Sequence, residues 1–64
     1  MIIHMKVGTQ TARDWHVVRK LIRPIIGERF FATEVGPCGI VPEPMRLMEI
    51  RIIKGWPLYV AEKY

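Results

Sequence analysis

The sequence predicts an α+β fold in which one amphipathic helix packs on a small, mostly antiparallel sheet of three to five strands, in the order β-α-β-(β)-β-β. Three observations predict it: apolar residues alternate at the N-terminus, recur every three or four positions over residues 15–26, and alternate again over residues 46–53. The length of 64 residues allows a single small α+β domain, residues 1–64.

The first strand is expected over residues 1–7, where Ile3, Met5 and Val7 alternate with the other side chains. Gly8 follows and ends the pattern. One face of this strand is therefore expected to contribute to the core.

The helix is expected to begin at Thr11, which forms a capping box with Asp14 three positions later. Pro24 disfavours helical geometry at the residue before it, so the helix is expected to end near Arg23. One apolar stripe at helical spacing would face the sheet, and it comprises Trp15, Val17, Val18, Leu21, Ile22, Ile25 and Ile26. Ile25 and Ile26 would remain buried in the turn after the helix.

Residues 29–35 are expected to form the second strand because aromatic and β-branched side chains dominate them. Residues 36–39 have the composition of a turn, and residues 40–41 could form a short extended piece. Pro42 and Pro44 then make a stiff connector that lacks two backbone donors.

The C-terminal part is expected to be a hairpin. Residues 46–53 alternate clearly, with Met48, Ile50 and Ile52 on one face. Residues 54–57 would form the loop, and residues 58–64 the returning strand.

Composition excludes several classes of protein. Half of the residues are apolar, which excludes disorder, and no apolar run approaches the ~18 residues of a membrane span. The N-terminus lacks the pattern of a signal peptide, and Cys38 is the single cysteine, which fits a reducing compartment. We therefore expect a cytoplasmic protein that does not contact membranes.

The charge is lopsided, because the net charge of +4 arises in the first half of the chain. Five basic side chains would lie within an arc of about 120° on the polar side of the helix, with no acid among them. We expect this row to contact nucleic acid, a nucleic-acid-processing complex or an acidic protein surface. The alternative is an ordinary solvated helix face. The row comprises Arg13, His16, Arg19, Lys20 and Arg23.

A second functional hypothesis is a protein–protein interaction module, such as an inhibitor or an assembly subunit. Its apolar sheet face and C-terminal hairpin would bind the partner, with Ile53, Trp56 and Tyr59 as anchors. The surplus of apolar residues in so short a chain also predicts a homo-oligomer.

Catalytic chemistry is not expected. His4 and His16 are the only imidazoles, nothing in the sequence brings either to Cys38, and the carboxylates are scattered. Two histidines and one cysteine cannot complete a structural zinc site, and no phosphate-binding loop is present. We predict a small basic binding or regulatory protein with no cofactor and no small-molecule substrate. In size and composition it resembles small regulatory or inhibitory proteins of phages and mobile elements, without a shared motif.

Overall fold

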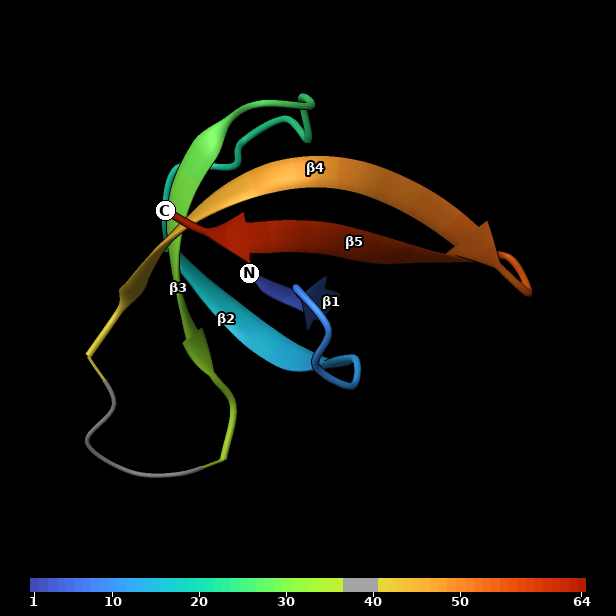
Figure 1. The fold of residues 1–64 in the computed structure, drawn as a ribbon, viewed down its shortest axis with the longest axis horizontal. Helices are drawn as coiled ribbons and strands as arrows, with labels where there is room; N and C mark the ends of the chain where they lie inside the picture. Colours follow the sequence, from blue (N-terminus) through green and yellow to red (C-terminus); the bar gives the residue numbers. More distant parts are fainter. Residues whose placement is uncertain (37–40) are drawn as a thin grey trace.

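The computed structural model describes residues 1–36 and 41–64, which form a closed five-stranded β-barrel (Figure 1). Neighbouring strands along the chain pair antiparallel, and β1 pairs in parallel with β5 to close the barrel. The parallel pair follows from geometry, because an up-and-down meander with an odd number of strands ends in the direction in which it began. The strands are β1 (Ile2–Val7), β2 (Arg13–Arg19), β3 (Arg29–Glu34), β4 (Glu43–Ile53) and β5 (Trp56–Lys63).

The core fills the inside of the barrel with side chains from every strand. On β1, Ile3, Met5 and Val7 point inward while Ile2 and His4 are exposed, as strand geometry requires. The cluster of buried side chains is Ile3, Met5, Val7, Trp15, Val17, Leu21, Phe30, Ala32, Met45, Leu47 and Ala61.

The predicted helix, and with it the α+β class, is wrong. Residues 13–19 form β2, and the described residues contain no helix. Trp15 and Val17 are buried at a period of two, whereas Ile22 and Ile25 are 93% and 59% exposed. The adjoining strands β1 and β3 supply the backbone partners of β2, and its β-branched residues suit a strand better than a helix. The absence of a helix also means that no described segment could cross a membrane as one.

The expected capping box is also absent, because Asp14 lies within β2 rather than at a helix start. Its cross-strand neighbour on β1 is His4, and the His4 Nδ1 to Asp14 Oδ1 distance is 3.0 Å. The carboxylate therefore bridges two strands on the outside of the barrel.

The chain leaves β2 through a left-handed turn. Lys20 and Leu21 have φ values of 68° and 63°, which residues other than glycine rarely adopt. Leu21 is only 1% exposed and belongs to the core, while Lys20 is exposed. The turn thus places these two neighbours on opposite sides of the barrel wall.

The β4–β5 hairpin is longer than the rest of the barrel and extends from it along the long axis of the molecule (Figure 1). Lys54 and Gly55 both have positive φ and form a two-residue turn, which is the geometry that matches strand twist. The loop is therefore shorter than the expected 54–57, and Trp56 and Pro57 belong to β5. A bulge between Leu47 and Glu49 interrupts the register of this hairpin.

The other strands lie close to their predicted positions. Strands β1 and β3 match residues 1–7 and 29–35 within a residue. The expected connector is wrong at Pro44, because β4 begins at Glu43 and Pro44 pairs with Phe31 of β3. The predicted turn at 36–39, the extended piece at 40–41 and Cys38 lie wholly or partly outside the described residues.

Candidate functional site

The barrel separates the five basic residues that the helix would have placed in one row. Arg13 pairs with Glu34 across β2 and β3, and this hydrogen bond raises the pKa of Arg13 above its ordinary value. His16 is exposed on the outside of β2 beside Ile2 and Thr33. Without a helix there is no single basic row. The remaining members, Arg19, Lys20 and Arg23, lie at the end of β2 and in the connection to β3.

Most acids are committed to ion pairs along the strands. Within residues 1–36 and 41–64, Glu28 alone of the six acids makes no ion pair. Four Lys or Arg side chains are neutralised in this way, namely Arg13, Arg46, Arg51 and Lys63. The cations without an acidic partner in the described chain are Lys6, Arg19, Lys20, Arg23, Arg29 and Lys54. Four of them fall between residues 19 and 29, a stretch whose one acid is Glu28, so it carries three of the four net positive charges of the chain.

Two exposed aromatic rings lie beside these cations. Phe31 points outward from β3, because its neighbours Phe30 and Ala32 point into the core. Its cross-strand neighbours are Arg19 on β2 and Pro44 on β4. A basic side chain therefore stands directly next to an exposed ring.

The second ring is Tyr64, at the end of β5. Its backbone N–H donates to the carbonyl of Pro44 at 2.9 Å, which ties it to the start of β4. The Arg29 guanidinium carbon lies 4.1 Å from the centre of the Tyr64 ring, a cation–π contact that orients the ring. Tyr64 remains 57% exposed.

A pocket of about 260 Å³ lies beside the two exposed rings. Lys20, Arg29, Phe31 and Tyr64 all line it, and Pro44 with parts of Phe30 and Met45 forms the remainder. We call Arg19, Lys20, Arg29, Phe31 and Tyr64 the basic-aromatic surface. It combines positive charge with exposed π-systems.

Sequence reasoning found Arg19 and Lys20 but missed Arg29, Phe31 and Tyr64. The predicted strand at 29–35 already implied that Arg29 and Phe31 share a face. The position of Tyr64 depends on how β3, β4 and β5 pair, which the sequence does not reveal locally.

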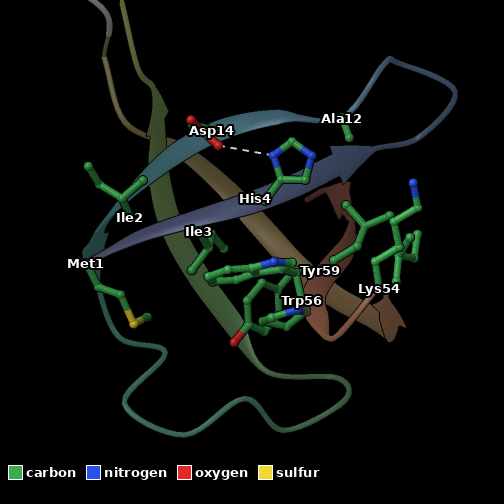
Figure 2. Close-up of a pocket in the computed structure, with 12 residues that line it drawn as sticks. Met1, Ile2, Ile3, His4, Ala12, Asp14, Lys54, Trp56 and Tyr59 are labelled. Atoms are coloured by element: carbon green, nitrogen blue, oxygen red, sulfur yellow. Dashed lines mark hydrogen bonds and ion pairs between the residues drawn. The ribbon is translucent and has the colours of Figure 1, made fainter.

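A larger hollow, of about 750 Å³, lies between the first residues of β1 and the β4–β5 hairpin (Figure 2). We call it the hairpin groove. It exists because β1 and β5 pair only over Met5–Val7 and Tyr59–Ala61, so the two strands are not joined before those residues. The predicted interface residues Ile53, Trp56 and Tyr59 all line it.

The rim of the hairpin groove carries both charges. The His4–Asp14 pair lies on one side and Lys54 on the other, with Trp56 and Tyr59 between them (Figure 2). Trp56 is 77% exposed, an unusual position for an indole ring.

No group of three or more His, Cys, Asp or Glu residues in the described part of the chain could hold a metal ion. Comparison of the chain with protein-family models, curated proteins and solved structures found no match. Fold and surfaces therefore define its class: a small all-β barrel with a basic-aromatic surface and an apolar groove.

Proposed function

We propose that this protein binds single-stranded nucleic acid through the basic-aromatic surface. The observation that carries the proposal is the grouping of cations without acidic partners around two exposed aromatic rings. Single-strand binders combine these two features, because phosphates need positive charge and unstacked bases need a ring to stack on.

The proposal gives each of these side chains a role. Arg19 and Lys20 are placed to neutralise phosphates, each displacing condensed counterions from the strand. Phe31 and Tyr64 offer ring faces to bases, with Arg29 holding the Tyr64 ring in position. One unstacked base would lie in the pocket of about 260 Å³ that Lys20, Arg29, Phe31 and Tyr64 line.

A single strand fits this surface better than a double helix. The bases of a duplex are stacked on each other and cannot reach Phe31 or Tyr64. Reading the major groove requires a protruding helix or β-ribbon, whereas the basic-aromatic surface surrounds a pocket on the barrel.

The proposal is tested by fluorescence anisotropy with labelled twelve-nucleotide DNA and RNA strands at low salt. The decisive variants are Lys20→Glu and Lys54→Glu. Both lysines are exposed, both have positive φ, and both substitutions change the net charge equally, but only Lys20 belongs to the basic-aromatic surface. We expect Lys20→Glu to weaken binding at least about tenfold and Lys54→Glu to have little effect.

Equal losses in the two variants would show a response to net charge alone and would contradict the proposal. A lipid surface is the competing partner, because Ile22, Ile25 and Ile26 are exposed in the connection that carries Arg23. Binding to vesicles containing phosphatidylserine, without binding to either oligonucleotide, would replace the proposal with a membrane-surface function.

A further inference from the structure

We infer that the hairpin groove binds a second copy of this chain, with Trp56 of each copy seated in the groove of the other. This inference goes beyond the proposed function and does not depend on it. The occupant is argued from the size, the edge chemistry and the charge of the groove.

Exposed apolar side chains gather at the hairpin groove. Met1, Ile2, Ile53 and Trp56 are 58%, 64%, 51% and 77% exposed. All four line the hairpin groove. Apolar side chains that gather at one groove, rather than lying scattered singly, mark interaction sites.

The edge of β5 argues against an added strand as the occupant. In a two-residue hairpin the closing pair Ile53 and Trp56 exchanges hydrogen bonds, so the next pair, Ile52 and Pro57, does not. The backbone nitrogen of residue 57 therefore faces β1, and proline has no hydrogen there to donate. An incoming strand would lose a ladder bond at this position, so side chains rather than backbone are suited to fill the groove.

The groove is complementary to itself, as a two-fold dimer requires. A two-fold interface brings the same patch together twice, so the patch must contain both the protruding group and its receptor. Trp56 protrudes beside an apolar hollow, and the rim carries Asp14 and Lys54 with opposite charge. Each Lys54 can then lie near Asp14 of the partner copy.

The arrangement also keeps like charges apart. The hairpin tip lies at one end of the long axis, and Tyr64 at the C-terminus lies toward the other end (Figure 1). A dimer formed through the hairpins would leave the basic-aromatic surfaces far from the two-fold axis, where their mutual repulsion is screened.

Sedimentation equilibrium of nucleic-acid-free protein tests the inference. We expect the wild-type chain to sediment at twice its mass of 7.5 kDa, and Trp56→Ala to raise the dimer dissociation constant on the order of a hundredfold or more, because both copies lose a central indole. The matched control is Ile22→Ala, which removes an apolar side chain that is 93% exposed elsewhere. It should leave the dimer unchanged.

Tryptophan fluorescence on dilution gives a second measurement. Trp15 is buried at 4% exposure in the single chain, so a concentration-dependent shift of emission reports Trp56. A wild-type chain that remains at 7.5 kDa up to millimolar concentration would overturn the inference. A dimer whose dissociation constant is unchanged by Trp56→Ala would also overturn the inference. The same holds if Ile22→Ala raises the dissociation constant as much as Trp56→Ala does.

Discussion

Lys20 and Leu21 connect the core of the barrel to its basic-aromatic surface. Both occupy the left-handed region, which costs roughly 1–2 kcal/mol for each residue that carries a Cβ atom. Burial of Leu21 offsets this cost, since a fully buried leucine contributes about 2 kcal/mol. Lys20 is exposed, so burial does not offset the cost at that residue.

Replacing Lys20 with glycine should therefore separate stability from binding. Glycine adopts positive φ freely, so Lys20→Gly should leave the free energy of unfolding unchanged or raise it by up to about 1 kcal/mol. The same variant should bind single strands more weakly because a phosphate contact is lost. Urea denaturation and anisotropy measure the two effects. Normal binding by this variant would show that Lys20 is not part of the binding surface.

Glu49 and Arg51 form a short ion pair on β4, with 2.6 Å between Arg51 Nε and Glu49 Oε1. The hydrogen bond from Arg51 holds the pKa of Glu49 below its ordinary value. A carboxyl group with a lowered folded pKa stabilises the protein above its unfolded pKa, and this contribution is lost as the pH falls through the folded pKa.

An NMR titration that follows the side-chain carboxyl carbon of Glu49 measures the pKa of this group directly. The midpoint should lie below that of an ordinary glutamate in the wild type and should rise in Arg51→Ala. A midpoint that is the same in the wild type and in Arg51→Ala would contradict the assignment of the lowered pKa to the hydrogen bond from Arg51.

At the scale of elements, β2 is the segment that the sequence misassigns. Its apolar residues fit a helical period by coincidence, because Trp15, Val18 and Ile22 are spaced by three and four. The barrel uses a period of two instead, burying Trp15 and Val17 and leaving Val18 at a bulge between Val17 and Arg19. Pairing with β1 and β3 decides the outcome, and that pairing involves residues far along the chain.

The strands that alternate regularly were predictable, and so was part of each surface. Ile53, Trp56 and Tyr59 were expected to act together and do line one groove. The faces of β4 were not predictable, because Met45 and Leu47 fill the core while Met48 is 43% exposed at the bulge. A one-residue bulge changes which face a strand presents, and alternation alone does not reveal it.

Two apolar truncations distinguish the barrel from the helical arrangement. Val17→Ala should lower the free energy of unfolding by about 2 kcal/mol, because Val17 is packed in the core. Ile22→Ala should change it by less than ~0.5 kcal/mol, because that side chain is exposed. Thermal or chemical unfolding measures both. A large loss from Ile22→Ala would favour the helix.

The whole molecule separates its two surfaces along its long axis. Acids paired along the strands neutralise much of the barrel, which leaves positive charge around the end of β2 and the β2–β3 connection. The tip of the β4–β5 hairpin lies at one end of the long axis, and the C-terminus lies toward the other (Figure 1). A dimer built through the hairpins would carry two copies of the basic-aromatic surface proposed to bind single strands. Such a pair would hold a long strand more tightly than a short one, because the second contact becomes intramolecular.

The most direct measurement is a titration of the ¹⁵N-labelled protein with a twelve-nucleotide single strand, followed by amide chemical shifts. The account predicts shift changes at Arg19, Lys20, residues 29–31 and Tyr64, fading as salt is raised, with no change across residues 53–59. Shift changes confined to residues 53–59, or none at low salt, would contradict the claim that the basic-aromatic surface binds nucleic acid.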